Sequence, residues 1–533
     1  MVFLYTHLLP SFHCNPVTKT PMNFLKENKV ALFLAIAKFM LPYLLQSPAY
    51  ELHRDEMLYL EQGHHLAWGF MEVPPLLGLL ATIVHFLGSG FFWVKFWPSF
   101  FGAANLFLIC RMAKEMGGKN FAQFVAGLGL ICGGYLRVHF LFQANFLDIF
   151  FWTLSAFYII RYINTQQVKY VYAIALSLAL GWLGKYSVAF FATAIFVGLL
   201  LTVNRKLFLS KHLYAATALA LLIMLPNLLW QYNHKWPVIH HMKELRETQL
   251  QFINPFRFLL NQLLMNIATS FVWIGGFIWL LFFKPGKPYR ILAWMYVTVI
   301  VLLTATNGKD YYALGAYPML FAAGGVWLQQ ITTVKMHWFR YAAVAIIFVL
   351  FLPIIPAIIP VWEPEKLAKY YRKTGLDKTG INHWEDLKDH QLPQDFADMQ
   401  AWKEMAGKVS DLYAKLPDST RKRTMVYCRN YGLAGALKYY GKGLPAINSD
   451  NGSFLLWMPD TYDVHTLLYV GRRIPEKDDE VFQQFEKYSV VDSIVNEYAV
   501  EKGTKIILYE NGNKLVSAMI EKGIREMKDE FRR

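Results

Sequence analysis

Long apolar runs separated by short polar segments dominate the first two thirds of the chain. A helix needs about 20 mostly apolar residues to cross a bilayer, and the pattern predicts eleven such helices in a mainly α-helical bundle. The predicted spans are residues 30–47, 96–112, 121–135, 145–162, 170–184, 187–203, 212–230, 261–283, 290–306, 311–328 and 340–360. Several of them are short, so we expect tilted helices or a locally thinned bilayer.

The apolar run at residues 74–92 is ambiguous, because it suits either a span or an interfacial element. If it stays outside, nearly all short basic loops fall on one side of the membrane, as the positive-inside rule requires. These loops carry Lys26/Lys29, Arg111/Lys114/Lys119, Arg161/Lys169, Arg205/Lys206/Lys211, Lys284/Lys287/Arg290 and Lys335/Arg340. We therefore predict that residues 74–92 do not span and that residues 48–95 form a large first outer loop.

The pattern changes at about residue 361, where charged and apolar residues become mixed. Short β-like runs at Thr424–Cys428, Leu444–Asn448, Thr466–Val470, Tyr488–Ile494 and Lys505–Glu510 alternate with helical stretches at Gly432–Tyr440 and Asp478–Lys487. This alternation predicts a small α/β domain. The expected organisation is a cytoplasmic segment at 1–29, a transmembrane domain at 30–360 and a soluble extracytoplasmic domain at 361–533.

The net charge of +15 is confined to the membrane half of the chain. Residues 1–360 contain 26 Lys or Arg and 11 Asp or Glu, whereas residues 361–533 contain 27 of each. Membrane topology explains this asymmetry better than nucleic-acid binding does. The four cysteines include no CxxC pair, which argues against a disulfide framework or a thiolate metal site.

Five of the 11 acidic residues of the membrane half lie within residues 47–75, directly after the first predicted span. Acidic groups at the membrane edge are costly and usually functional. Asp55, in this stretch, and Asp148, near the outer end of the fourth span, are the leading catalytic candidates, because a carboxylate can remove a proton from a hydroxyl group. Two simpler roles stay open: an ion pair of Asp55 with Arg54, and capping of its own helix by Asp148.

Several further polar residues fall on the same side as Asp55. Arg137, Lys185 and Lys309 suit a lipid phosphate, although lysines near span ends also extend to lipid headgroups without a specific ligand. His53, His64 and His65 match no metal-ligand spacing, so a divalent cation stays an open question. The chain contains no P-loop, GxGxxG, HExxH or GxSxG motif, and an outward-facing enzyme would need a lipid-carried donor.

An ordered series of motifs resembles bacterial family 39-type glycosyltransferases, relatives of the protein O-mannosyltransferases and of the aminoarabinose transferase that modifies lipid A. The motifs are His-Arg-Asp-Glu-Met-Leu-Tyr-Leu (53–60), Gly-His-His-Leu-Ala-Trp-Gly-Phe (63–70), Val-Pro-Pro-Leu (73–76), Leu-Phe-Gln-Ala-Asn-Phe-Leu-Asp (141–148), Gly-Lys-Tyr-Ser (184–187), Leu-Pro-Asn-Leu-Leu-Trp-Gln (225–231), His-Lys-Trp-Pro (234–237) and Gly-Lys-Asp-Tyr-Tyr-Ala-Leu-Gly-Ala-Tyr-Pro (308–318). Residues 430–437 and 444–449 also resemble the C-terminal part of this group.

The resemblance implies a GT-C fold and transfer of a sugar from a polyprenyl-phosphate carrier to an envelope lipid, glycan or protein. It implies that Asp55 is the general base, that Glu56 completes an Asp-Glu pair and is itself catalytic, and that Asp148 is a second acidic catalytic position. The residues expected to bind substrate are His53, Arg54, Tyr59, Arg137, Lys185, Tyr186, His234, Trp236, Lys309, Tyr311 and Tyr312. Lys-Asp-Tyr-Tyr at 309–312 replaces the commoner Lys-Pro-Tyr-Tyr, which places an extra acid, Asp310, beside the phosphate candidate Lys309.

The implied location is the bacterial inner membrane, with the site and the C-terminal domain facing the periplasm or exterior. Two other functions stay open. A flippase or transporter of lipid-linked sugars would also have many spans, although transporters usually show repeated halves. A non-catalytic envelope assembly protein would use mainly its soluble domain.

Overall fold

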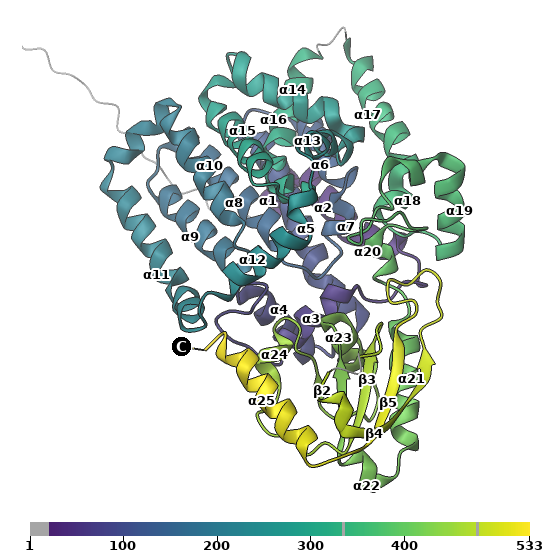
Figure 1. The fold of residues 1–533 in the computed structure, drawn as a ribbon. Helices are drawn as coiled ribbons and strands as arrows, with labels where there is room; N and C mark the ends of the chain where they lie inside the picture. Colours follow the sequence, from purple (N-terminus) through teal and green to yellow (C-terminus); the bar gives the residue numbers. More distant parts are fainter. Residues whose placement is uncertain (1–20, 333–335, 476–478, 533) are drawn as a thin grey trace, which may run out of the picture.

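The computed structural model describes residues 21–332, 336–475 and 479–532, and it consists of a helical bundle joined to a smaller domain built on a sheet (Figure 1). Residues 1–20 of the predicted cytoplasmic segment, Lys335 of a predicted basic loop and Asp478 of a predicted helix lie outside the described residues. The predicted fold class, a transmembrane-type helical bundle followed by an α/β domain, is confirmed.

Each of the eleven predicted spans contains a helix. The bundle helices are α2 (Lys29–Leu45), α5 (Phe91–Glu115), α6 (Asn120–Ile131), α8 (Asn145–Thr165), α9 (Lys169–Gly184), α10 (Val188–Leu200), α11 (Lys211–Asn233), α13 (Pro255–Leu264), α14 (Ser270–Phe282), α15 (Arg290–Ala305), α16 (Pro318–Ile331) and α17 (Trp338–Phe351). Five helices in the described ranges are long and apolar enough to cross a membrane, or seven if each of two bent pairs counts as one span. The number eleven therefore stays a prediction.

The ambiguous run at residues 74–92 contains the short helix α4 (Leu76–Phe86). At 1.5 Å per residue this helix is about 16 Å long, roughly half the thickness of the hydrocarbon layer. It packs against α3 (Arg54–Gln62), α5 and α9. Its length suits an element at the membrane edge better than a span, as the distribution of basic loops predicts.

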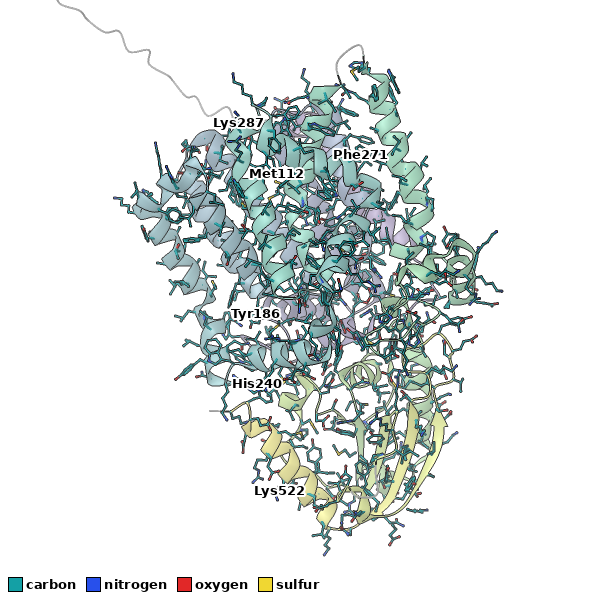
Figure 2. All side chains as sticks on the ribbon, turned by 45° about the horizontal axis from the view of Figure 1, so that its top comes forward. Met112, Tyr186, His240, Phe271, Lys287 and Lys522 are labelled. Carbon is teal, nitrogen blue, oxygen red and sulfur yellow. The ribbon has the colours of Figure 1, made fainter. Side chains whose placement is uncertain are left out.

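The two ends of the bundle differ in chemistry. At one end Arg161 forms an ion pair with Glu115 at 2.6 Å, and Lys114 lies 3.7 Å from Glu27. Figure 2 shows Lys287 at this end and Tyr186 and His240 at the end that faces the C-terminal domain. The predicted basic loops and the predicted outer loops are thus separated, while the orientation in a membrane stays a prediction.

The C-terminal domain contains a five-stranded mixed sheet in the order β2-β1-β3-β5-β4. The strands are β1 (Thr424–Cys428), β2 (Ile447–Asn448), β3 (Thr466–Gly471), β4 (Phe485–Ser493) and β5 (Lys505–Gly512). The first three are parallel, and β5 and β4 are antiparallel additions.

The helix predicted at Asp478–Lys487 is wrong: its described part holds a 3-10 turn at Phe482–Gln484, and β4 then starts at Phe485. β4 is a mostly exposed edge strand whose pairing with β5 overrides its helix-like charge pattern.

The first loop and the C-terminal domain share one apolar core. Leu52 and Met57 from the loop pack in the same cluster as Trp402, Val426 and Leu433 from the domain. The other helices of this domain include α19 (Pro364–Thr374), α21 (Trp402–Lys415), α23 (Tyr431–Tyr440) and α25 (Leu515–Asp529). The C-terminal domain therefore packs directly against the loop that carries Asp55, in addition to being connected to the bundle through the chain.

Candidate active site between the bundle and the C-terminal domain

The first turn of α3 places Asp55 at the junction of the two parts. His53 is the N-cap residue: its Nδ1 accepts a hydrogen bond from the Asp55 backbone N–H at 3.1 Å, and its own N–H donates to Glu56 Oε2 at 2.8 Å. This reciprocal capping box fixes where the helix begins. The short polar sequence His-Arg-Asp-Glu thus encodes the local geometry of the candidate base.

Glu56 is fully buried and fully bonded. Lys95 Nζ lies 2.5 and 2.6 Å from its two carboxylate oxygens, and the Phe142 backbone N–H donates to Oε1 at 2.7 Å. A buried carboxylate with a paired cation and further hydrogen-bond donors is satisfied and inaccessible. These contacts join α3, α5 and the segment before α8, which favours a positioning role for Glu56 over the catalytic role that we expected.

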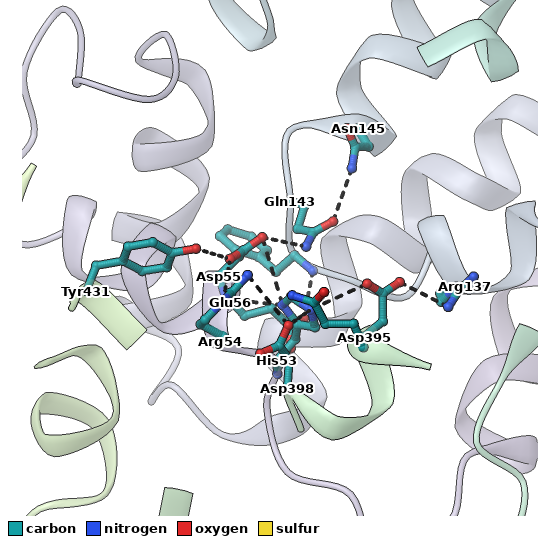
Figure 3. Close-up of polar contacts among 12 residues, drawn as sticks. His53, Arg54, Asp55, Glu56, Arg137, Gln143, Asn145, Asp395, Asp398 and Tyr431 are labelled. Carbon is teal, nitrogen blue, oxygen red and sulfur yellow. Dashed lines mark hydrogen bonds and ion pairs between the residues drawn. The ribbon is translucent and has the colours of Figure 1, made fainter. Parts of the chain in front are cut away.

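Asp55 differs from Glu56, because its side chain is 24% exposed. Tyr431 Oη donates to Oδ1 at 2.8 Å, and Gln143 Nε2 donates to Oδ2 at 3.0 Å (Figure 3). Burial acts to raise the pKa of Asp55, but the charges of His53 and Arg54, the Tyr431 hydrogen bond and the charge of Lys309 together lower it. Asp55 is therefore ionised at neutral pH and accessible to a ligand.

Two glycines allow Tyr431 to reach Asp55. A Cβ at Gly432 would lie 2.6 Å from Arg54 Cγ, and one at Gly435 would lie 2.9 Å from Met57 Cβ. Non-bonded carbon atoms do not approach so closely, so larger residues at these positions would push α23 away from α3. The Arg54 guanidinium also lies over the Tyr431 ring, 5.6 Å from its centroid.

Three carboxylates from the C-terminal half face basic residues of the predicted site, and two of them face cations expected to bind phosphate. Glu385 Oε1 lies 3.3 Å from Lys309 Nζ, and Asp395 Oδ2 lies 3.0 Å from an Arg137 guanidinium nitrogen. Asp398 is buried, 3.6 Å from Arg54 and 3.8 Å from His53. Burial raises the pKa of Asp398 to about 6, although Arg54 and His53 act in the opposite direction.

Lys185, in the loop between α9 and α10, extends this charged cluster toward the bundle. Its Nζ donates to Asn145 Oδ1 at 2.6 Å and lies 4.4 Å from the centroid of the Tyr312 ring and 5.5 Å from that of Tyr311. Burial lowers the pKa of Lys185 to about 8, with the charge of Asp148 acting in the opposite direction. Asp148 is itself buried in the first turn of α8.

Tyr59 belongs to the same cluster. Burial and the charge of Asp55 raise the pKa of the Tyr59 hydroxyl, and Tyr311 and Tyr312 contribute to the shift. The structure therefore gathers nearly all of the predicted site residues around Asp55.

Three predicted substrate-binding residues are placed elsewhere. The Tyr186 hydroxyl accepts hydrogen bonds from Asn227 and Gln231 of α11, at 3.1 and 2.8 Å. His234 stacks on the Trp230 ring of its own helix, and Trp236 is the left-handed residue that starts α12 (Pro237–Thr248). None of the contacts found within the described ranges joins these three side chains to Asp55, and their part in substrate binding stays a prediction.

The sequence did not single out six residues of this site. Gln143, Asn145 and Tyr431 lie inside stretches that resemble the family, so the motifs contained a signal that we did not assign to single residues. Glu385, Asp395 and Asp398 lie in a charged stretch with no recognisable pattern. Only the tertiary structure identifies these three acids.

The described residues offer no good metal site. Within residues 21–332, 336–475 and 479–532, no group of three or more His, Cys, Asp or Glu side chains is arranged to hold an ion. His53, the candidate ligand nearest to Asp55, uses its Nδ1 in the helix cap.

Comparisons with known proteins agree with this architecture. The family model described as "dolichyl-phosphate-mannose-protein mannosyltransferase" matches residues 72–230. The lipid A galacturonosyltransferase RgtD of Rhizobium johnstonii is 22% identical over 278 residues. That alignment covers 49% of this chain and 58% of the relative, so the chain spans less than two thirds of the curated relative that it matches.

Two solved structures share the fold over almost their whole length. ArnT from Cupriavidus metallidurans bound to undecaprenyl phosphate aligns with a TM-score of 0.62 and 11% identity, covering 92% of this chain and 98% of ArnT. The apo state of the same protein aligns with a TM-score of 0.57 and 13% identity, covering 90% and 97%. The resemblance predicted from the motifs is confirmed to this extent: part of the chain matches a protein mannosyltransferase family model and a lipid A galacturonosyltransferase, and its fold is shared with ArnT.

Proposed function

We propose that this protein is an integral membrane glycosyltransferase that moves a sugar from a polyprenyl-phosphate carrier to an acceptor on the outer side of the membrane. The observation that carries the proposal is one accessible, ionised carboxylate, Asp55, set among the cations Arg54, Arg137, Lys185 and Lys309 at the junction of bundle and C-terminal domain. A base beside a cationic site is what transfer from a phosphate leaving group requires.

Asp55 is the group that accepts the proton. Each of its oxygens accepts one hydrogen bond from a neutral donor, and Arg54 Nε also forms an ion pair with Oδ1 at 3.5 Å, so Oδ2 is the oxygen that better keeps a lone pair for an incoming hydroxyl or amine. As the proton leaves the acceptor, the acceptor oxygen or nitrogen attacks the anomeric carbon. The bond from that carbon to the phosphate oxygen breaks, and the phosphate takes the bonding electron pair. Because the acceptor attacks the face opposite the phosphate, the anomeric configuration is inverted.

The cations stabilise the departing phosphate. Lys185 is the strongest candidate, because its partner is the neutral amide Asn145, whereas Lys309 and Arg137 already face Glu385 and Asp395. Cations at the depth of the lipid headgroups attract a phosphate more strongly than water does. The apolar spans beside them suit the polyprenyl chain, and the ArnT complex with undecaprenyl phosphate supports this class of carrier.

The acceptor class is an envelope lipid, glycan or protein. A relative that acts on lipid A makes lipid A the first acceptor to test. The inner membrane, with the site facing the periplasm or exterior, is the location in which carrier and acceptor meet. The carboxylates of the C-terminal domain lie next to Asp55, so this domain forms part of the acceptor path.

The test is sugar transfer in purified membranes from a labelled polyprenyl-phosphate-sugar pool. Wild type is compared with Asp55→Asn and with Asp411→Asn, an exposed carboxylate on α21 that serves as the matched control. We expect label to move to the acceptor with wild type and Asp411→Asn, and a loss of about 10³-fold or more with Asp55→Asn. Wild-type turnover by Asp55→Asn would refute the proposal, and label that crosses the membrane while staying on the carrier would favour a flippase.

A further inference from the structure

A chain of hydrogen bonds connects Lys185 with Asp55. Lys185 Nζ donates to Asn145 Oδ1 at 2.6 Å, Asn145 Nδ2 donates to Gln143 Oε1 at 3.1 Å, and Gln143 Nε2 donates to Asp55 Oδ2 at 3.0 Å. The last two links are drawn in Figure 3. Two neutral amides thus join a cation and an anion that come from different parts of the fold.

The chemistry of the two ends sets the direction of both amides. An ammonium group only donates hydrogen bonds, and an ionised carboxylate only accepts them. Asn145 must therefore present its oxygen to Lys185, and Gln143 must present its nitrogen to Asp55. The Asn145 nitrogen then faces the Gln143 oxygen, so every link satisfies its neighbour, and flipping either amide would break two contacts.

We infer that Asn145 and Gln143 form a polarised relay through which Lys185, the candidate phosphate ligand, positions Asp55 and holds it in its ionised form. The inference rests on the proposed function for the roles of its two ends. Asn145 and Gln143 are positioning residues, because each acts through the group that it contacts: Asn145 through Lys185 and Gln143 through Asp55.

The relay links donor binding to the base. Lys185 has three N–H donors, and one of them is used by Asn145. The other two N–H groups can bind a phosphate without breaking the relay. A bound sugar-phosphate donor therefore fixes the position of Lys185, and through the two amides it also fixes the position of Asp55. Hydrogen bonds in such a chain polarise one another, which strengthens the last link to the carboxylate.

Other titratable groups also act on Asp55, and their effects must be distinguished from that of the relay. They are His53 and Arg54 beside it, Tyr59 on the same helix, Lys309 and Tyr311 from the loop before α16, Tyr431 from α23, and Asp398 from the C-terminal half. Among the hydrogen bonds described above, Lys185 is linked to Asp55 only through Asn145 and Gln143. Changes at these two amides therefore test the relay without removing a charge.

The experiment measures the protonation of Asp55 directly, without depending on turnover. The full-length protein in lipid nanodiscs is treated with a carbodiimide, which couples to protonated carboxyl groups, across a pH series. Labelling of the Asp55 peptide is read by mass spectrometry, with Asp55→Asn as the blank. The variants are Gln143→Met and Asn145→Leu, with Asn164→Leu, an asparagine at the other end of α8, as the matched control.

We expect the midpoint of Asp55 labelling to move upward by about one pH unit in Gln143→Met, because a hydrogen bond to a charged group is lost. The midpoint should move by a smaller amount in Asn145→Leu and stay unchanged in Asn164→Leu. Lys185→Met should shift it in the wild-type background and add much less in the Asn145→Leu background. Should Gln143→Met not fold, Gln143→Asn keeps an amide one methylene shorter and should give a smaller upward shift.

Two results would overturn the relay. An unchanged midpoint in Asn145→Leu would show that Asn145 does not act on Asp55. An equal Lys185→Met shift in both backgrounds would show that Lys185 acts through space alone. Full sugar transfer by Asp55→Asn would instead refute the proposed function and leave the labelling result standing, so the two failures are distinguishable.

Discussion

Replacing Tyr431 with phenylalanine removes one hydrogen bond from the candidate base and leaves the ring in place. Tyr431 Oη donates to Asp55 Oδ1 at 2.8 Å, and this bond is one of the interactions that lower the pKa of Asp55. A base acts only when it is deprotonated, so transfer is lost as the pH falls through the pKa of Asp55. Tyr431→Phe should raise that pKa and move the acidic limb of the pH profile upward.

The size of the shift follows from the contact. A hydrogen bond to a charged group contributes roughly 1.5–3 kcal/mol, and about 1.4 kcal/mol corresponds to one pKa unit. Asp55 is 24% exposed and keeps its bond from Gln143, so we take the lower end of that range, a shift of about one unit. On the acidic limb this makes transfer about tenfold slower, whereas the plateau at higher pH should stay close to wild type.

The assay is the initial rate of sugar transfer in membranes from about pH 3 to 8, expressed as kcat/KM for the acceptor, because the acidic limb of wild type lies below the ordinary pKa of an aspartate. Tyr439→Phe is the matched control, because Tyr439 lies on the same helix and donates its hydroxyl to the Ser89 carbonyl at 2.6 Å instead of to a carboxylate. Its acidic limb should not move. A Tyr431→Phe profile lowered equally at every pH, with the limb unmoved, would mean that Tyr431 only supports packing and that the electrostatic reasoning is wrong.

Three further changes test other parts of the site. Lys95→Met should lower the free energy of unfolding by about 3–5 kcal/mol, because it leaves the Glu56 carboxylate buried and unpaired. The measurement is the melting temperature, and a variant as stable as wild type would contradict the expectation. Burial raises the pKa of Asp398 from 3.8 to about 6, so the folded protein binds more protons than the unfolded chain between these values, and this contribution to stability is lost as the pH rises. As the pH rises from about 4 to 6.5, the melting temperature of Asp398→Asn should therefore fall less than that of wild type. An equal fall in the two proteins would refute the raised pKa of Asp398. Glu385→Gln removes the carboxylate that faces Lys309 and should lower the KM for the sugar-phosphate donor about two- to threefold. The effect is small because Glu385 is 40% exposed. A raised KM would indicate that Glu385 itself contacts the donor.

The sequence by itself determined the helical bundle, the small α/β domain and the cluster around Asp55. The bundle was predictable because a bilayer requires long apolar helices, which leave an unmistakable pattern. The cluster was predictable because charged residues at a membrane edge are rare enough to be noticed, and Asp55, Arg137, Lys185 and Lys309 indeed lie together. The roles of these residues remain predictions for the experiments above.

Only the tertiary structure decided which groups touch Asp55 and which predicted ligands do not. Tyr431 lies 376 positions from Asp55 along the chain, and it reaches Asp55 because two glycines let α23 pack closely on α3. Tyr186 carries the same side-chain chemistry, yet α11 satisfies its hydroxyl and removes it from the cluster. Residue type and spacing specify local elements, whereas partners distant in sequence depend on how those elements pack, and a single sequence contains no direct record of that packing.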